Sequence, residues 1–588
     1  MTAMRALNDI RHTLLHSTGV GEFFGHEGFP EFDLDLMNMI LDEAAKLSDD
    51  IFSPLNPVGD RVGSKLGENG VTTPEGFRAA YQAFSEGGWG ALPFPEEFGG
   101  QGLPRTLAIA VMEMIMSANL SLSLCPTLTV GAIEALMTYG DDFQKSVILP
   151  KLVTGEWTGT MNLTEPQAGS DVGALKTKAE PNDDGSYSIT GQKIYISWGE
   201  HDMTDNIIHL VLARLPDAPE GTKGISLFLV PRFMVNEDGS IGEENAVKAI
   251  GVEHKMGLHG SPTCVMEYSG AKGWIVGEPN RGMMAMFVMM NNARLQVGLQ
   301  GTALCEAAFW EARDFANDRV QGKVMGKPAN TSILHHPDVQ NMLIRMRAYA
   351  LAARTLSYEC AKAADLAHVA TDEAVRKSAK AREDILTPIA KSWPTDTAID
   401  VTSMGVQVHG GMGYMGETEA AQFFRDSRIP PIYEGTNGIQ AIDLIGRKLG
   451  LEGGQAIHGL FADLTGEVEK LTSSDDQEIA DMAGALSEGL ELLQEETRWL
   501  QSQNEPFSSL MGATAYQRQI GSLLASIYML RGAANAKAAG TRDADEQLVL
   551  AKVFAAFELP GYASAKTKVR LSDVLSSEMS EKLVGIEA

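Results

Sequence analysis

The chain has 588 residues, of which 44% are hydrophobic and 21% are charged, and its formal net charge at pH 7 is -29. This length exceeds the ~250–300 residues at which a single hydrophobic core stops growing, so several domains are expected. The negative charge argues against a broad nucleic-acid or anionic-membrane surface, because phosphate groups attract basic proteins. A phosphate-bearing ligand would have to be held by local Arg, Lys or backbone N–H groups.

The cysteines and the N-terminus indicate a reducing, cytoplasmic location. The four cysteines match no zinc spacing, and a disulfide framework is not expected in so long a chain, so free buried thiols are predicted at Cys125, Cys264, Cys305 and Cys360. Charged residues interrupt the first fifteen residues, unlike the apolar segment of a signal peptide. No uninterrupted apolar run approaches the ~20 residues of a membrane helix, so no membrane span is expected.

Residues 1–159 are predicted to form a helical domain. Apolar residues recur at helical spacing between positions 34 and 51, with Asp and Lys between them. Thr73 and Pro74 supply a cap and a first-turn proline for a second helix that extends to Phe84. A loop rich in Pro and Gly follows, and helical patterning resumes at 106–116 and 131–139.

Residues 160–280 are predicted to form a β-domain. Residues 186–197 are rich in Tyr, Ile and Thr around Gly191, a pattern that predicts a hairpin. Further strands are expected at 207–213, 225–230, 263–268 and 273–277.

Residues 281–449 return to helical patterning, with long Ala-rich segments that predict an antiparallel bundle. Pro388 and Pro394 are expected to interrupt one of these helical segments locally without ending it. Three glycines between 450 and 454 indicate a linker, and residues 450–588 are predicted to form an additional helical domain. No solenoid repeat and no low-complexity block is found.

One carboxylate, Glu434, lies between an aromatic residue and Gly435. Pro430 and Pro431 just upstream impose an extended approach, and an apolar-faced helix begins near Gly438. Glu434 is therefore expected at a helix start, where unpaired backbone N–H groups favour negative charge. Considered alone, it is most simply a helix-capping residue.

Two stretches of small and hydroxyl-bearing residues mark the change from helix to strand. Residues 163–173, LTEPQAGSDVG, expose N–H groups and hydroxyls towards a planar ligand rich in heteroatoms; the alternative is an ordinary connecting turn. In residues 193–199, Tyr195 and Trp198 are candidates to flank an aromatic ring while Ser197 donates a hydrogen bond. A hydrophobic strand is the alternative there.

A third cluster contains Gly411, Gly413 and Gly416 in the spacing G-x-G-x-x-G. The predicted element before it is a helix and no βαβ unit surrounds it, so a Rossmann site is excluded. Close backbone approach to a phosphate or an adenosine is expected instead. No HExxH, Walker or nucleophile-elbow motif is found, so metal-dependent hydrolysis and phosphoryl transfer have no support, and no metal site is expected.

Taken in order, the segments LTEPQAGSD, GQKIYISWG, KMGLHGSP, QVHGGMGY and RDSRIPPIYEGTNGIQ resemble the acyl-CoA dehydrogenase family over roughly residues 30–450. The resemblance implies an α+β fold with an N-terminal helical domain, a central β-domain and a helical bundle. The further helical region from residue 450 resembles the large-subunit branch of the family. Within that branch, the chain is most similar to members that act on 3-methylmercaptopropionyl-CoA in dimethylsulfoniopropionate breakdown.

The resemblance implies non-covalently bound FAD and α,β-dehydrogenation of an acyl-CoA thioester to the 2-enoyl-CoA. Glu434 would be the base that removes the α-proton. The developing enolate oxygen would be stabilised by preorganised donors, which the family provides from the backbone N–H of this Glu and a flavin ribityl hydroxyl. Some relatives carry the base one residue before Arg294; here that position is Ala293, which supports Glu434.

The cofactor contacts that the resemblance implies are Leu163, Thr164, Gly169, Ser170, Tyr195, Ser197, Arg319, Gln321, Gln407, Gly410, Gly411, Thr436 and Asn437. Substrate contacts are implied for Ser170, Arg294 and Gly435. Arg319 and Gln321 would reach the FAD of a neighbouring subunit, which implies a homodimer. An electron-transfer flavoprotein is the implied electron acceptor.

Two alternatives remain open at this point. The first is a general fatty acyl-CoA dehydrogenase of medium or long chain in β-oxidation, or an oxygen-using oxidase relative. The second is an alkylation-response flavoprotein, which keeps this fold but binds DNA. The net charge of -29 and the lack of a basic C-terminal cluster oppose DNA binding.

Overall fold

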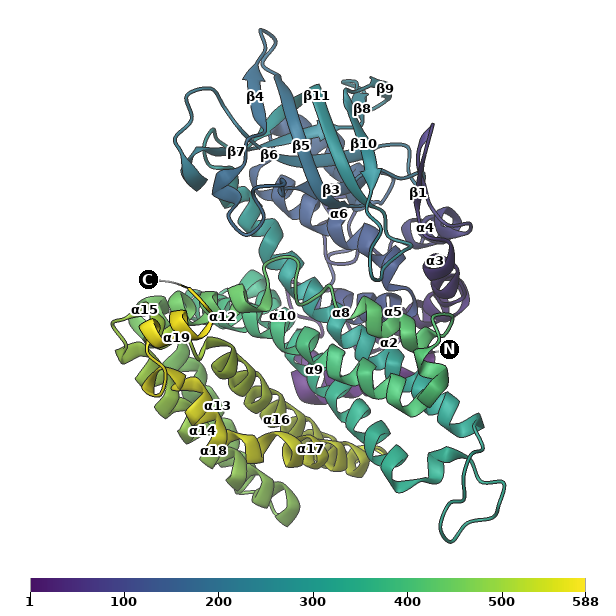
Figure 1. Cartoon of the computed structure of the whole chain (residues 1–588), viewed down its shortest axis with the longest axis vertical. Helices are drawn as coiled ribbons and strands as arrows, with labels where there is room; N and C mark the ends of the chain where they lie inside the picture. Colours follow the sequence, from purple (N-terminus) through teal and green to yellow (C-terminus); the bar gives the residue numbers. More distant parts are fainter. Residues whose placement is uncertain (1, 587–588) are drawn as a thin grey trace. The chain divides into compact units, whose positions relative to one another are not determined.

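The computed structural model describes residues 2–586, which divide into two compact units (Figure 1). The first unit contains residues 35–296 together with residues 2–4, and the second contains residues 5–34 and 297–586. Residues 5–34 thus pack with the C-terminal half of the chain. Asp9 of helix α1 (Ala3–His12) is one reason, because its carboxylate accepts two 3.0 Å bonds from Arg347.

The helices of the first unit precede its sheet. They are α2 (Leu34–Leu47), α3 (Asn56–Val62), α4 (Phe77–Glu86), α5 (Arg105–Ala118), α6 (Leu120–Tyr139) and α7 (Leu149–Val153), with a small hairpin formed by β1 (Lys65–Gly67) and β2 (Gly70–Thr72). Helix α4 begins at Phe77, three residues later than Pro74, because Gly76 before it has φ +92°, outside the helical conformation. The sequence pattern predicted only the second half of α6, whose start is capped by the Asn119 side chain.

Helix α6 corrects the expectation that no segment approaches the length of a membrane span. Its 20 residues are long and apolar enough to cross a membrane, with a mean hydropathy of 1.5. However, 78% of that window is buried inside the structure, where α6 packs against the first strand of the sheet. The same composition is typical of a central core helix, and the Ser and Thr residues along α6 bond to its own carbonyl groups.

The central sheet has seven strands, and the pairings connect five of them in a closed circuit. The strands are β3 (Thr158–Asn162), β4 (Lys178–Pro181), β5 (Tyr187–Ser197), β6 (Ile207–Arg214), β7 (Ile225–Pro231), β10 (Val247–Val252) and β11 (Thr263–Val276). All pairs are antiparallel except those that β6 makes with β3 and β4. A separate two-stranded sheet joins β8 (Phe233–Val235) to β9 (Ile241–Glu244).

The predicted hairpin over residues 186–197 is wrong, because this segment is the single strand β5. Gly191 lies in the middle of the strand and pairs with Tyr268 of β11. A Cβ added at Gly191 would lie 2.5 Å from the Thr177 hydroxyl. The glycine therefore serves the close approach of a neighbouring segment and not a turn.

The second unit is helical throughout its described residues, apart from connecting loops and turns. Helix α8 (Gly282–Asp318) follows the sheet, and its residues up to 296 belong to the first unit and those from 297 to the second. It is followed by α9 (Pro337–Val369), α10 (Glu373–His409), α11 (Glu419–Asp426) and α12 (Asn437–Gly446). Helix α10 continues past both Pro388 and Pro394 without a break. The C-terminal helices are α13 (Gln455–Thr472), α14 (Gln477–Ser502), α15 (Pro506–Leu510), α16 (Ala513–Ala539), α17 (Ala544–Glu558), α18 (Tyr562–Val569) and α19 (Ser577–Leu583).

Helix α16 joins the C-terminal region to the bundle, because it packs against α9, α10 and α12 as well as α14 and α17. The four cysteines are free and buried, as the sequence predicted. The α+β class and the order of helical domain, β-domain, bundle and extra C-terminal helices are likewise confirmed.

Candidate active site

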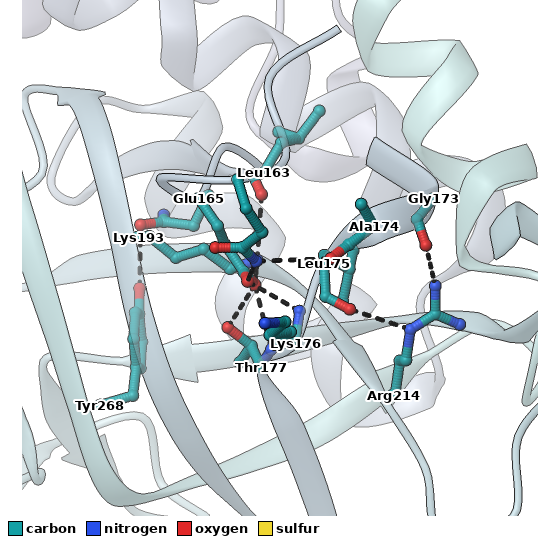
Figure 2. A network of polar contacts seen from close by, with 12 residues as sticks. Leu163, Glu165, Gly173, Ala174, Leu175, Lys176, Thr177, Lys193, Arg214 and Tyr268 are labelled. Carbon is teal, nitrogen blue, oxygen red and sulfur yellow. Dashed lines mark hydrogen bonds and ion pairs between the residues drawn. The ribbon is translucent and has the colours of Figure 1, made fainter. Parts of the chain in front are cut away.

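In the first unit, the turn over residues 163–171 is held by a buried ion pair (Figure 2). Lys193 of β5 is fully buried, and its ammonium lies 2.8 Å from the Glu165 carboxylate and 3.0 Å from the Leu163 carbonyl oxygen. Glu165 is 4% exposed and also accepts hydrogen bonds from the Thr177 hydroxyl at 2.6 Å and from the backbone N–H groups of Lys176 and Thr177. The turn therefore has a fixed shape.

The two charges of this pair are maintained by their mutual contact. Burial raises the pKa of Glu165, but the Lys193 ammonium and the hydrogen bonds outweigh it and lower the pKa to about 2. Burial lowers the pKa of Lys193 to about 8, against the opposing effect of Glu165. Both groups are thus charged at neutral pH. Sequence analysis missed the pair, although an inward-facing Lys two residues after Gly191 in an alternating strand was a usable signal.

Arg214 of β6 braces residues 173–175, which directly follow the same turn (Figure 2). Its guanidinium donates to the Leu175 carbonyl oxygen at 3.0 Å and to the carbonyl oxygen of Gly173. The turn and the residues that follow it are therefore supported by cationic side chains from the sheet. Of the sequence-predicted residues on it, Leu163 and Thr164 are half-buried, whereas Gly169 and Ser170 are exposed.

Strand β5 ends in an irregular segment that turns Tyr195 outwards. The pairing with β11 shifts register between Cys264 and Met266, opposite Tyr195, which marks a β-bulge. Tyr195 has φ +61° and is 60% exposed. A non-glycine residue at positive φ costs about 1–3 kcal/mol and such residues cluster at functional sites. The neighbouring Ile194 N–H donates to the Thr164 carbonyl oxygen at 2.9 Å, which joins the bulge to the turn.

Trp198 does not take the place that the sequence suggested for it. It also has positive φ, +53°, but its side chain is 1% exposed and packs edge-on against His201. Tyr195 is therefore the aromatic ring that this segment presents at the surface, while Ser197 is half-buried. The expectation that the rings of both Tyr195 and Trp198 flank a ligand is therefore wrong for Trp198, whose ring is buried.

Arg294 lies near the start of α8 and is buried within the first unit. The preceding Asn292 donates to Glu134 of α6 at 2.7 Å, and Glu134 is paired with Arg105 of α5 at 2.7 Å. A small cavity adjoins this polar group; its walls are Phe84, Trp89, Gly90, Pro93, Arg105, Ala108, Ile109, Met112, Pro126, Val130, Glu134, Asn292 and Gln296.

In the second unit, Glu434 occupies a strained turn. Its φ is +54°, and Gly435 follows with φ +83°. The Asn437 N–H donates to the Pro431 carbonyl oxygen at 2.9 Å and closes the loop over residues 431–437. The Gln440 side chain donates to the carbonyl oxygens of Glu434 and Gly435 at 3.4 and 3.2 Å. The backbone on both sides of the carboxylate is thus held in place.

The helix-capping interpretation of Glu434 is wrong. Helix α12 begins at Asn437, and its cap is Thr436, whose hydroxyl accepts from the Ile439 N–H at 3.2 Å. Glu434 lies two residues before this cap and is half-buried. Its carboxylate is therefore placed by the loop and serves another purpose than ending the helix.

Tyr433 adjoins Glu434 and is anchored to α8, because its hydroxyl donates to the Gln300 side chain. Burial, together with the negative charge of Glu434, raises the pKa of Tyr433 well above its usual value. The tyrosine therefore stays protonated beside the carboxylate. Sequence analysis missed Gln300, although a glutamine within the apolar length of α8 was the available signal.

Asn437 is buried and its side chain is used within the protein. Its carbonyl oxygen accepts from Lys391 at 2.8 Å, and its amide nitrogen donates to Asp396 at 2.7 Å and Thr395 at 3.0 Å. These partners all lie on α10. The side chain thus ties the Glu434 loop to the bundle, and any cofactor contact of Asn437 would involve its backbone.

The glycine cluster follows α10 directly, so the exclusion of a Rossmann site is confirmed. A Cβ at Gly413 would lie 2.4 Å from the Val406 carbonyl oxygen, whereas Gly410 and Gly411 face open space. His409 is buried and its ring stacks on Phe315 at 4.2 Å. The sequence-predicted residues exposed in the second unit are Arg319, Gln321, Gln407, Gly410 and Gly411. Within residues 2–586, no group of His, Cys, Asp and Glu side chains is suited to a metal ion.

Four family models match the chain in succession. They are the acyl-CoA dehydrogenase N-terminal domain at residues 62–156, its middle domain at 160–271, its C-terminal domain at 280–450, and an acetyl-CoA dehydrogenase C-terminal-like domain at 461–579.

Curated relatives and solved structures agree with these models. A 3-methylmercaptopropionyl-CoA dehydrogenase of Ruegeria pomeroyi is 42% identical over 90% of this chain and 93% of its own length. A butyryl-CoA dehydrogenase of Syntrophomonas wolfei is 35% identical over 84% of this chain and 83% of its own length. The structure of an acyl-CoA dehydrogenase complexed with FAD from Bacillus anthracis superposes with a TM-score of 0.76 at 21% identity, covering 95% of this chain and 92% of that one.

Proposed function

We propose that this chain, which belongs to the acyl-CoA dehydrogenase family, oxidises 3-methylmercaptopropionyl-CoA to its 2-enoyl-CoA. It is an acyl-CoA dehydrogenase and its cofactor is FAD. The assignment of Glu434 rests on the geometry of its turn. Its backbone has positive φ, and hydrogen bonds from Asn437 and Gln440 hold the loop that carries the carboxylate.

The residues of each unit fit FAD. In the first unit, Tyr195 offers an exposed ring beside a rigid turn, a surface suited to a planar ring system. In the second unit, Gly410 and Gly411 leave the backbone uncovered, which suits close approach of a phosphate or an adenosine. When bound, FAD accepts the hydride from the β-carbon. We assign Leu163, Thr164, Gly169, Ser170, Tyr195 and Ser197 to the flavin, and Gln407, Gly410 and Gly411 to the adenosine end.

Glu434 is the proposed base for the α-proton. A thioester α-proton is weakly acidic, so the thioester oxygen needs preorganised donors as negative charge develops on it. We assign one of these donors to the backbone N–H of Glu434, because Gln440 holds the carbonyl oxygen of the same residue, in the next peptide group, and so limits rotation of the Glu434 backbone. Arg294 and Gly435 are the proposed CoA and substrate contacts. Ala293, beside Arg294, carries no group that could replace the base.

The proposed acyl group is short. The Ruegeria relative is similar over nearly the whole of both chains and acts on 3-methylmercaptopropionyl-CoA by its name. The cavity in the first unit adjoins Asn292, next to Ala293, where some relatives carry the base. Its small size and its aromatic and Met walls suit a short thioether-bearing chain better than a long alkyl chain. The second candidate function is a general short-chain or medium-chain acyl-CoA dehydrogenase, because a butyryl-CoA dehydrogenase is also among the similar proteins.

The substrate is tested by comparing kcat/KM for 3-methylmercaptopropionyl-CoA, butyryl-CoA and palmitoyl-CoA with an artificial electron acceptor. We expect 3-methylmercaptopropionyl-CoA to exceed palmitoyl-CoA by at least about 10-fold, the discrimination that a few methylene groups provide in a small apolar pocket. Butyryl-CoA, of similar length, should lie between them. A clear preference for palmitoyl-CoA would contradict the substrate and favour a long-chain enzyme.

The proposed assembly is a cytoplasmic homodimer that passes electrons to an electron-transfer flavoprotein. Apolar side chains in two exposed segments of the second unit support an interface: Met325 is 96% exposed and Tyr414 is 89% exposed. Arg319 and Gln321, exposed in the first of these segments, are the residues we assign to the partner's FAD. DNA binding is disfavoured by the net charge of -29.

A further inference from the structure

The extra C-terminal helices contact the same segment of α10 that holds the Glu434 loop. Asn437, in this loop, bonds to Lys391, Thr395 and Asp396 of α10. At the next residue of the helix after Asp396, the Arg518 guanidinium of α16 donates to the Thr397 hydroxyl at 3.1 Å. The two sets of contacts therefore share one short segment of α10.

Arg518 is itself firmly placed. Its guanidinium lies 5.0 Å from the centre of the Trp393 ring, and its second nitrogen is 3.5 Å from the Glu558 carboxylate of α17. The Trp393 indole donates to the Ser522 hydroxyl at 3.0 Å, and Ser522 in turn donates to Glu558. This network fixes the register between α10 and the C-terminal helices.

Asp396 connects the two sets of contacts. Its carboxylate accepts the amide of Asn437 at 2.7 Å. Burial raises the pKa of Asp396, and the Asn437 hydrogen bond and the positive charge of Arg518 oppose this effect. Arg518 is bonded to Thr397, the residue after Asp396, so it adds positive charge beside this carboxylate, as Lys391 also does. A positive charge favours the ionised carboxylate, which accepts a stronger hydrogen bond than a neutral acid.

We propose that Arg518 is a positioning residue for the dehydrogenation, acting through Asp396 and Asn437 on the loop that carries Glu434. The inference rests on the proposed function of Glu434 as the base. It gives the C-terminal region, which a separate family model matches at residues 461–579, a part in catalysis beyond covering the bundle.

The test compares Arg518→Gln with Arg531→Gln in the full-length FAD-bound protein. Arg531 lies on the same helix and also makes a buried ion pair, with Glu359 and Glu467, but none of its hydrogen bonds or ion pairs reaches Asp396 or the loop. We expect Arg518→Gln to lower kcat about 10-fold with little change in KM, because small misplacement of a catalytic group is costly. Arg531→Gln should lower Tm while leaving kcat near that of the wild type.

Amide hydrogen exchange supplies a readout that does not depend on turnover. Arg518→Gln should speed exchange of the amides in residues 431–439, whereas Arg531→Gln should leave them as in the wild type. Arg518→Lys, which keeps the charge, should restore part of kcat. If Arg518→Gln does not fold, Asp396→Asn carries the same test, with the same expected loss of kcat and faster loop exchange.

Three outcomes separate the possible failures. Equal loss of kcat in Arg518→Gln and Arg531→Gln, with unchanged loop exchange in both, overturns the positioning role. A wild-type rate and unchanged loop exchange in Arg518→Gln or its substitute Asp396→Asn also overturns it. If instead the wild type oxidises no acyl-CoA, or Glu434→Gln is fully active, the proposed function fails, and with it the catalytic part of this inference.

Discussion

Glu434→Gln is expected to lower acyl-CoA turnover by about 10³-fold, within the range that a general base contributes. The substitution keeps the size of the side chain and removes its basicity. The contacts that hold the turn, from Gln440 and Asn437, are made to or through the backbone and should persist. The variant should therefore remain yellow, with its flavin content unchanged. Turnover with an artificial acceptor and the flavin absorbance spectrum measure both properties.

Glu452→Gln is a matched control for this variant. Glu452 is also a glutamate at positive φ, +53°, in the second unit, and it is paired with Lys377 at 2.9 Å. It lies outside the proposed site, so its substitution should leave turnover unchanged. Equal activity losses in the two variants would show that Glu434 acts on the fold and would remove its assignment as the base.

Lys193→Met is expected to destabilise the first unit by about 3–5 kcal/mol, because it leaves the Glu165 carboxylate buried without its counter-charge. The turn at residues 163–171 should loosen, since Lys193 also bonds to Leu163. We therefore expect weaker FAD retention together with a lower Tm, measured by thermal unfolding and by flavin release on dilution.

The double variant Glu165→Gln/Lys193→Met separates the charge from the packing. Replacing both members of a buried ion pair often lowers the free energy of unfolding far less than removing one member. The pKa of Glu165 is lowered from 4.5 to about 2, so the unfolded chain binds more protons between these values. The contribution of the ionised Glu165 carboxylate is fully present above pH 4.5 and is lost as pH falls towards 2; this acid sensitivity should be reduced in the double variant. Equal stability of the single and double variants would refute the argument.

The sequence predicted the elements wherever hydrophobic period alone determines them. The long bundle helices and the strands β6 and β7 are examples, because their apolar runs are buried on most sides. Prediction failed where a residue served a distant contact. Gly191 resembled a turn residue, but its role depends on Thr177 lying against it. Helix α6 began eleven residues before the predicted start because its first half is buried by tertiary packing, without an amphipathic pattern.

The candidate site divides in a similar way. Glu434 could be selected because its chemistry and neighbours stand together in the sequence. The residues that hold its loop could not be predicted from the sequence. Gln300 and Asp396 lie far from Glu434 along the chain, and folding brings them to Tyr433 and Asn437 of the loop. Thr436 and Asn437 were predicted near the cofactor, and the structure shows their side chains capping α12 and bonding α10. The prediction that Thr436 and Asn437 contact the cofactor therefore applies to their backbone atoms.

The structure also changes the view of the C-terminal region. The sequence predicted an additional helical domain there, and α16 of this region packs on α9, α10 and α12. The polar contacts from Arg518 and Ser522 to α10 add a route by which this region supports the Glu434 loop.

The central claim, that Glu434 removes the α-proton so that the β-hydride can pass to FAD, is tested most directly by flavin reduction without any external acceptor. The purified protein is mixed anaerobically with 3-methylmercaptopropionyl-CoA, and the oxidised flavin absorbance is followed in a stopped-flow instrument. We predict rapid bleaching in the wild type and at least about 10³-fold slower bleaching in Glu434→Gln, at equal flavin content. Bleaching of Glu434→Gln at the wild-type rate would contradict the account.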